Sequence, residues 1–222
     1  MSLLTTSIRR SFALRAIAGF LVAAALLTVI GLPAKAGWFQ YPDEAIRDYI
    51  QTLEFPALTM VMRFITRLGS TSVLVLFGSI VVVTFAFARW WRRIGLFLIA
   101  MAGQIVLHLG FNWLFDIDRP QPLLDYIIGD TPSFPSGHAM ASLSFYGILA
   151  FFITRRITSY SAKCVIWILA ASLIFLIGFS RVYFGVHHPS DVIAGFLASA
   201  IWTWTVASGD DNVVTGSNLS RV

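Results

Sequence analysis

The sequence contains few charged residues. Asp, Glu, Lys and Arg make up 12% of the 222 residues, whereas a soluble domain carries about 25%. Hydrophobic residues make up 57% and the mean hydropathy is +0.78. A net charge of +5 could indicate nucleic-acid binding, but the apolar background argues against such a partner. The composition predicts an integral membrane protein.

Cysteine is almost absent, and low-complexity segments and internal repeats are missing. Cys164 is the only cysteine, which excludes a disulfide framework and a thiolate metal cluster. It lies within an apolar run, where we interpret it as a packing residue. The length suits a single domain.

Long apolar runs dominate the sequence instead. There are six of them: Ala16 to Leu32, Thr71 to Ala88, Ile94 to Phe115, His138 to Thr154, Cys164 to Phe179 and Val192 to Ala207. A spanning helix needs about 17–25 residues, so the last three are short, as expected if their polar ends form a site below the headgroups. We predict an all-α membrane protein with six transmembrane helices in one domain over residues 1–207. The polar segment 208–222 is predicted to be a disordered cytoplasmic tail.

The distribution of charge predicts the orientation. Three segments on one side of a six-helix topology contain basic but no acidic residues: Arg9, Arg10 and Arg15; Arg89, Arg92 and Arg93; Arg155, Arg156 and Lys163. The other side carries nine of the eleven acidic residues: Asp43, Glu44, Asp48, Glu54, Asp116, Asp118, Asp125, Asp130 and Asp191. By the positive-inside rule the basic side is cytoplasmic, which predicts a multi-pass protein of the inner (plasma) membrane.

The first apolar run fits two interpretations. It follows basic residues and precedes Ala34-Lys35-Ala36, which is also the pattern of a secretory signal with a cleavage site. The length of the apolar stretch favours an uncleaved helix, and the orientation downstream is the same in both cases.

Two short amphipathic helices are predicted between the first and second runs. Ile46, Tyr49, Ile50 and Leu53 recur at helical spacing, with Asp43 as the expected N-cap. A second apolar face follows Pro56. Such helices at the outer interface either guide a lipid toward the site or form a structural collar around the bundle.

Three polar motifs emerge on the same, outer face of this topology. Arg119-Pro120 follows the third run, Pro135-Ser136-Gly137-His138 opens the fourth, and Ser180-Arg181 precedes His187 and Asp191 at the sixth. Taken singly, each has a structural interpretation: a capped helix start, an interfacial histidine or an arginine that reaches the headgroups. Taken together, the three motifs lie on one face, and their residue types and spacing suit a common function. This combination favours a single shared site.

The residue types suit phosphoryl transfer. Arginine offers a planar fork of donors that matches phosphate oxygens, and a helix start such as that after Ser136 binds anions through its free amides. His187 and Asp191 are four residues apart, so the carboxylate can orient the ring and increase its nucleophilicity. His188 is interpreted as structural.

These motifs resemble the type 2 phosphatidic acid phosphatase superfamily, also called lipid phosphate phosphatases. The family pattern is Lys-x6-Arg-Pro, then Pro-Ser-Gly-His, then Ser-Arg-x5-His-x3-Asp. The second and third motifs match in full and the first matches at Arg119 and Pro120. The resemblance covers about residues 94–207.

The resemblance implies a mechanism without metal or other cofactor. His187 attacks phosphorus and forms a phosphohistidine, Asp191 orients it, and His138 protonates the leaving oxygen and then activates water. Arg119, Arg181, Ser136 and the amide of Gly137 hold the phosphate oxygens. The expected substrate is a lipid phosphate or diphosphate of the undecaprenyl diphosphate, phosphatidylglycerophosphate or phosphatidic acid type, and the oligomeric state is not predicted.

Asn112 is the one departure from the pattern, since it replaces the family's lysine. It is a candidate phosphate-binding residue that keeps a donor but removes a charge, which predicts weaker phosphate binding, a catalytically weakened protein or a different preferred headgroup. We expect a lysine at position 112 to tighten phosphate binding. His108, four residues earlier, is a second candidate, although a packed histidine fits equally.

Two other functions remain open at this point. A phosphotransferase would pass the phosphoryl group from His187 to an acceptor other than water. A non-enzymatic membrane protein would use His138, His187 and Asp191 as metal ligands. Asp116 and Asp118 also form an Asp-x-Asp pair, which we interpret as a solvated loop.

Overall fold

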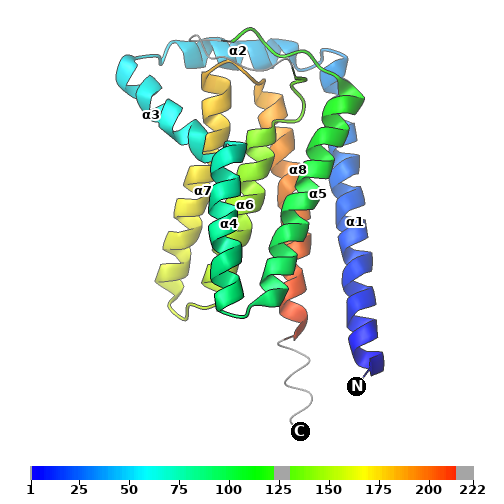
Figure 1. The fold of residues 1–222 in the computed structure, drawn as a ribbon. Helices are drawn as coiled ribbons and strands as arrows, with labels where there is room; N and C mark the ends of the chain where they lie inside the picture. Colours follow the sequence, from blue (N-terminus) through cyan, green and yellow to red (C-terminus); the bar gives the residue numbers. More distant parts are fainter. Residues whose placement is uncertain (1, 123–130, 214–222) are drawn as a thin grey trace.

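A bundle of long helices carries two short helices across one of its ends (Figure 1). The computed structural model describes residues 2–122 and 131–213. The long helices are α1 (Ser2–Lys35), α4 (Thr71–Phe87), α5 (Trp91–Phe115), α6 (Gly137–Thr154), α7 (Tyr160–Tyr183) and α8 (Pro189–Ala207). The short ones are α2 (Gln40–Gln51) and α3 (Pro56–Leu68). No strand occurs in the described ranges, so the all-α prediction is confirmed.

Each predicted apolar run coincides with one long helix. Five helices are long and apolar enough to cross a membrane, and there are six spans if α3 and α4, bent by 50° at their junction, count as one. α7 extends beyond its apolar run at both ends, from Tyr160 to Tyr183. α8 also begins before its run, at Pro189, whereas α6 begins at Gly137, directly before its run, and ends with it at Thr154.

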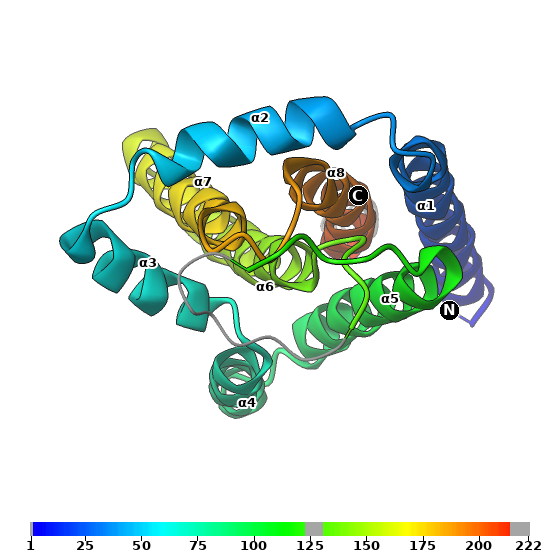
Figure 2. The same ribbon diagram turned by 90° about the horizontal axis from the view of Figure 1, so that it is seen from above.

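α2 and α3 lie across the end of the bundle, as the sequence predicted for two amphipathic helices (Figure 2). Ile50 of α2 and Met62 and Ile65 of α3 are buried against the bundle. Tyr49 and Phe64 remain exposed, which suits contact with lipid headgroups and chains. The prediction of Asp43 as the N-cap of α2 is wrong, because the helix begins one turn earlier, at Gln40 after the N-cap Phe39.

Small residues allow the long helices to approach closely. α8 packs against α1, α5 and α6, and Trp202 of α8 lies over Gly103 of α5 and donates from Nε1 to the Ala100 carbonyl at 2.9 Å. Phe20 of α1 meets the same indole edge to face at 5.5 Å. Without a hydrophobic driving force between helices in lipid, such close packing and buried hydrogen bonds hold the bundle together.

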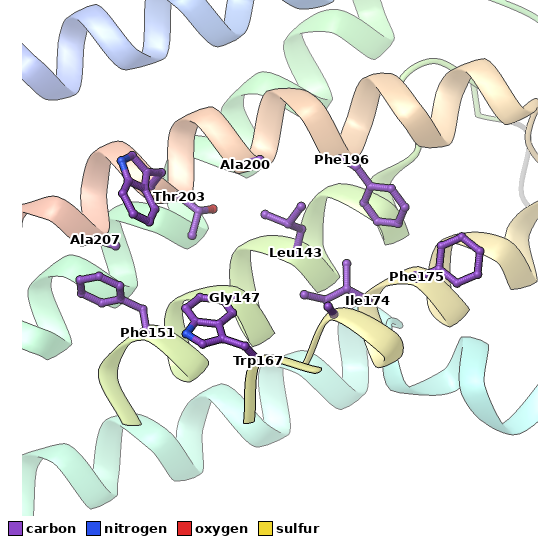
Figure 3. A pocket seen from close by; sticks show the side chains of 12 residues that line it. Leu143, Gly147, Phe151, Trp167, Ile174, Phe175, Phe196, Ala200, Thr203 and Ala207 are labelled. Carbon is purple, nitrogen blue, oxygen red and sulfur yellow. The ribbon is translucent and has the colours of Figure 1, made fainter. Parts of the chain in front are cut away.

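An apolar cavity of about 430 Å³ lies between α7 and α8, with α6 as its floor (Figure 3). Trp167, Phe175 and Phe196 line it, and Thr203 contributes a polar atom. Phe196 packs against Gly178 at the end nearer the start of α8.

The far end of the bundle is more ordered than the sequence predicted. Ser208–Val213 form a 3-10 helix, η1, and Asp210 makes a 3.0 Å ion pair with Arg93. Residues 208–213 are therefore helical and not part of a disordered tail, because a partly buried ion pair fixes η1. Residues 214–222, like Asp125 and Asp130, lie outside the described residues.

Candidate active site

The predicted site residues meet at the end of the bundle beneath α2 and α3. Arg119 lies in the loop after α5, Ser136 precedes α6, Arg181 lies in the last turn of α7, and His187 and Asp191 flank the start of α8. Ser136, Arg181, His187 and Asp191 are at most 3% exposed. Buried polar groups at this density need partners or a ligand, and their contacts define what the site can do.

His187 is fixed by a carboxylate on one ring nitrogen. Its Nδ1 lies 3.4 Å from Oδ2 of Asp191 and 3.4 Å from Oγ of Ser133. The same Oδ2 accepts hydrogen bonds from Ser133 Oγ and, at 2.9 Å, from the amide of His188. An acceptor at this position assigns the proton to Nδ1, so Nε2 carries the lone pair.

Arg119 lies on the other nitrogen of the same ring. Its Nη1 is 3.0 Å from Nε2 of His187 and donates to the Val186 carbonyl at 2.9 Å. Nε and Nη2 donate to the carbonyl and hydroxyl of Thr131 at 2.7 and 3.0 Å. The guanidinium is thus held beside Nε2, the atom that would attack phosphorus. From there it can donate to a phosphate oxygen in place of Nε2.

The electrostatic environment keeps both groups in the state that this chemistry needs. Burial lowers the pKa of His187 to about 4, against the opposing effect of the Asp191 carboxylate. Burial, with the positive charge of Arg181, also lowers the pKa of Arg119 from its usual value, yet a guanidinium stays charged in proteins. At neutral pH the site holds a neutral imidazole beside a cation.

His138 lies across the site from His187. Its ring is near Gly69 at the end of α3, where a Cβ would lie 3.2 Å from Cδ2. Arg181, His187 and Arg119 are close enough to act on it electrostatically. This position suits proton transfer to and from a group bound at His187.

The start of α6 supplies the second half of an anion site. Ser136 donates its amide to the Asp191 carbonyl at 3.2 Å, and its carbonyl accepts from Met140. Its Oγ is buried and has no hydrogen-bond partner in the described part of the chain. Arg181 is held by a 2.8 Å hydrogen bond from Nη1 to Thr66 Oγ1. A free hydroxyl, the first amides of α6 and two guanidiniums together match a phosphate group.

At the start of α8, carboxylates already accept hydrogen bonds from the backbone amides of His188 and Ser190. Asp43 of α2 is 6% exposed, and its carboxylate accepts from the amide and hydroxyl of Ser190 at 3.0 and 2.6 Å. Burial raises the pKa of Asp43, while these two hydrogen bonds act in the opposite direction. Because Asp43 and Asp191 already accept from this helix start, we expect an anion to be held by the start of α6 and the arginines instead.

Asn112 binds the loop before α6. Its Nδ2 donates to the carbonyls of Pro132 and Phe134 at 2.9 and 3.2 Å. Both donor hydrogens are thereby used inside the protein. The geometry makes Asn112 a positioning residue for the segment that carries Ser133 and Ser136, whereas direct phosphate binding by Asn112 stays a prediction.

Replacing Asn112 with leucine is expected to loosen that loop. Two carbonyls lose their donor, and an unsatisfied buried group costs about 1–3 kcal/mol. We expect a lower melting temperature and a fall in kcat of about tenfold or more, because Ser133 and Ser136 shift. The measurements are thermal unfolding in detergent and initial rates on a lipid phosphate.

Asn112→Lys is the matched control, since its ammonium keeps donors for the same carbonyls. It should retain stability better than Asn112→Leu and, with its added charge, lower the inhibition constant for phosphate. Equal stability and rates in the leucine variant and the wild type would show that the loop does not depend on this amide.

Nothing in the sequence indicated that three further residues belong to the site. Ser133, Thr66 and Asp43 contact Asp191, Arg181 and Ser190 across long chain separations. Only the run Pro132-Ser133-Phe134-Pro135-Ser136 pointed to an ordered turn there. His108 packs against Gly137, where a Cβ would lie 2.8 Å from its Nε2, which supports the interpretation as a packed histidine.

The metal-binding interpretations find no donor set in the described ranges. No group of three or more His, Cys, Asp and Glu side chains there converges as metal ligands. Asp116 adopts a left-handed conformation, φ 46, at the end of α5. It terminates the helix, as asparagine or aspartate can.

A polar cavity of about 540 Å³ opens beside Asp191, on the side away from α3. Arg47, Arg119, His188 and Asp43 contribute to its lining. Arg47 donates to the Gln121 carbonyl at 3.0 Å and so ties α2 to the loop after Arg119. This cavity gives the partly exposed Arg119 and the buried Asp191 a route to water.

Known proteins are similar to this chain in both sequence and fold. The PAP2 superfamily model matches residues 93–213. Phosphatidylglycerophosphatase B of Bacillus subtilis is 30% identical over 179 residues, 78% of this chain and 86% of the relative. A putative undecaprenyl-diphosphatase of Escherichia coli is 35% identical over 109 residues, 46% of this chain and 50% of the relative.

The crystal structure of a transmembrane PAP2-type phosphatidylglycerolphosphate phosphatase from Bacillus subtilis is similar throughout. Its TM-score is 0.76 at 28% identity, and the match covers 90% of this chain and 97% of that one. The match includes the helices that carry all three motifs, so the resemblance read from the motifs is confirmed. The chain is a multi-pass membrane protein that belongs to the PAP2 superfamily.

Proposed function

We propose that this protein is a lipid phosphatase that works through a phosphohistidine at His187. The observation that carries the proposal is the pair of contacts on that ring: Asp191 at Nδ1 and Arg119 at 3.0 Å from Nε2. A neutral imidazole with its lone pair beside a phosphate-binding guanidinium is a prepared nucleophile. The relatives named above are lipid phosphatases by name.

In the first step Nε2 of His187 attacks phosphorus and the bond to the leaving oxygen breaks. His138 gives its proton to that oxygen, so the alcohol leaves neutral. Nδ1 keeps its proton, and Asp191 stabilises the positive charge that forms on the ring. Arg119 and Arg181 offset the charge on the phosphoryl oxygens during transfer.

In the second step water takes the place of the alcohol. His138, now neutral, accepts a proton from the water as its oxygen attacks phosphorus. The bond between phosphorus and Nε2 breaks, and phosphate leaves with His187 restored. An acceptor alcohol in place of water would make the reaction a phosphotransfer.

A lipid substrate follows from the position of the site. The site lies at one end of an apolar bundle, beneath α2 and α3 with their exposed Tyr49 and Phe64. A phosphate carried on a membrane lipid reaches this depth while its chains stay in the bilayer. Phosphatidylglycerophosphate, undecaprenyl diphosphate and phosphatidic acid are the substrates we propose to compare.

The test is phosphate release by the purified protein in detergent from these three lipids. We expect release from at least one, at a rate far above that from a soluble phosphate ester. Transfer of the phosphoryl group to an added alcohol without free phosphate would identify a phosphotransferase. Inactivity on all three, in protein that is folded by thermal unfolding, would contradict the proposal.

Catalysis is expected to be independent of divalent metal. Two arginines and the start of α6 already supply the positive charge that a metal offers elsewhere. Vanadate, which adopts the geometry of pentavalent phosphorus, should inhibit, whereas EDTA should leave the rate within about twofold. Loss of activity in EDTA that returns with one added metal would overturn this expectation.

We propose that the site faces away from the cytoplasm, because basic residues gather at the other end of the bundle. Gln121, close to Arg119 in the chain, is exposed, and its backbone carbonyl accepts from Arg47. Gln121→Cys in a Cys164→Ser background should therefore react with a membrane-impermeant maleimide in intact cells. Labelling seen only after lysis would reverse the orientation.

A further inference from the structure

A second cluster of arginines lies at the end of the bundle opposite the site. The loop between α4 and α5, the end of α6 and η1 enclose a cavity of about 300 Å³ there. Its lining, which we call the arginine cavity, is Arg89, Trp90, Trp91, Arg92, Arg93, Arg156 and Asp210. Four guanidiniums face one carboxylate among the residues whose side chains the structure describes.

Two of the four arginines hold the cavity together. Arg93 pairs with Asp210 at 3.0 Å, and its Nη1 donates to the Phe152 carbonyl at 3.4 Å. Arg92 donates from Nη2 to the carbonyl of Gly209. These contacts attach η1 to α5 and α6, so the cavity has a fixed frame rather than a set of independent surface chains.

The positive charges are crowded around one ring. The guanidinium of Arg156 lies 4.4 Å from the centre of the Trp90 ring, and that of Arg93 lies 5.2 Å from the same centre. Each contact is favourable through the ring quadrupole, but the two cations repel each other at this spacing. Asp210 compensates one of them, which leaves a site that an anion would stabilise.

Arg89 occupies a backbone position that favours glycine. Its φ is 59, and the hydrogen bonds from Arg89 to Ala86 and from Trp90 to Phe85, at 3.0 and 2.8 Å, close the end of α4 as a Schellman motif does. A side chain in this left-handed region costs about 1 kcal/mol relative to glycine. Arginine here places a charged side chain on the cavity despite that cost.

We propose that the arginine cavity binds the phosphate of an anionic phospholipid headgroup in the leaflet at this end of the protein. Arg89 and Arg156 form no ion pair in the described ranges and are the donors left for a ligand. Trp91 of the lining is 66% exposed, and Phe87, two residues before Arg89 in the chain, is 87% exposed, as is typical of aromatic residues at a membrane interface. Basic pockets at the ends of membrane helices bind such headgroups.

The experiment compares lipid retention by purified variants using native mass spectrometry and thermal unfolding. Arg89→Gly combined with Arg156→Gln removes both free guanidiniums, and glycine suits the left-handed position, so the fold is kept. Lys163→Gln is the control, because it removes a positive charge from the same end of the bundle but does not line the cavity. Probes are phosphatidylglycerol, phosphatidylcholine and inorganic phosphate.

We expect the wild type and Lys163→Gln to retain phosphatidylglycerol in preference to phosphatidylcholine and to gain several degrees in melting temperature from it. The double variant should lose this preference by about tenfold while its melting temperature without lipid stays unchanged. Stabilisation by inorganic phosphate as strong as that by phosphatidylglycerol would identify a soluble anion as the ligand and overturn the lipid proposal.

Equal lipid preference in all three proteins would also overturn the lipid proposal. The arginines would then serve only to set the orientation of the protein in the membrane. Neither readout depends on turnover. The result therefore stands apart from the proposed phosphatase activity.

Discussion

Alanine in place of His187 is expected to reduce turnover of a lipid phosphate by about 10⁵-fold or more, the range seen when a nucleophile is removed from a preorganised site. The expectation rests on Nε2 of His187, which lies 3.0 Å from Arg119. Because Nδ1 donates a hydrogen bond to Asp191, Nε2 carries the lone pair that can attack phosphorus. The measurements are initial rates and acid-quenched trapping of a labelled phosphoenzyme. The wild type should yield a phosphoprotein with the acid lability of a phosphoramidate, and the variant none.

His188→Ala is the matched control. It removes the neighbouring imidazole but keeps the backbone amide that donates to Asp191 at 2.9 Å. We expect its rate to fall by about tenfold at most. A His187→Ala protein that retains more than about one part in a thousand of wild-type activity would exclude His187 as the nucleophile.

The pH dependence of the wild type provides an independent check on this role. A pKa of about 4 means that His187 is neutral at all pH values well above 4 and loses its lone pair only as the pH falls through that value. The contribution of His187 to the acid limb of kcat/KM should therefore appear near pH 4 rather than near 6.5, the ordinary value for histidine.

The sequence predicted the helices well, for physical reasons. Apolar runs report burial in lipid directly, and the residue spacing at His187 and Asp191 places them on adjacent turns at the start of a helix. The PAP2 resemblance and the all-α fold are confirmed. The roles of the individual residues remain predictions, although the structure brings all of them to one place.

The sequence could not predict contacts between distant segments. Asp43 looked like the cap of its own helix, yet it accepts from Ser190 of α8. This contact depends on how α2 crosses the bundle, which local periodicity does not encode. Ser133 and Thr66 were missed for the same reason, since each acts on a site residue from another element.

Asn112 shows a second limit of sequence reasoning. Its alignment with the family's lysine suggested a phosphate ligand, but its amide holds the carbonyls of Pro132 and Phe134. Asparagine keeps the hydrogen-bond donors of the lysine but not its charge. The sequence alone cannot decide which of these two properties matters at position 112. In the same way, the polar composition of residues 208–213 predicted disorder, because it does not indicate the Arg93–Asp210 ion pair that orders them.

Asp191→Asn is expected to lower kcat by about 10³- to 10⁴-fold while the protein stays folded. Oδ2 of Asp191 accepts from His187, Ser133 and the His188 amide, and an asparagine keeps these contacts only if its carbonyl oxygen, and not its NH2, takes the position of Oδ2. If its NH2 faces Nδ1, the imidazole proton moves to Nε2 and the nucleophilic lone pair is lost. Losses of this size follow when a buried carboxylate that fixes a histidine tautomer is replaced by its amide.

The sign of the pH effect separates this explanation from simple loss of charge. Asp191 raises the pKa of His187 against burial, so Asp191→Asn lowers that pKa further and leaves the ring neutral. Raising the pH should then restore no activity, because the defect is the tautomer and not protonation. Rates measured between pH 5 and 9, a range that brackets the ordinary pKa of histidine, test this.

Asp43→Asn is the matched control for the charge at the start of α8. It removes a second buried carboxylate, which contacts the first turn of α8 from α2, but leaves the contacts of His187 intact. We expect its kcat to fall by about tenfold at most, since Ser190 keeps an acceptor in the amide oxygen. Equal losses in the two variants would mean that Asp191 acts through the stability of the α8 start, and the tautomer role would have to be abandoned.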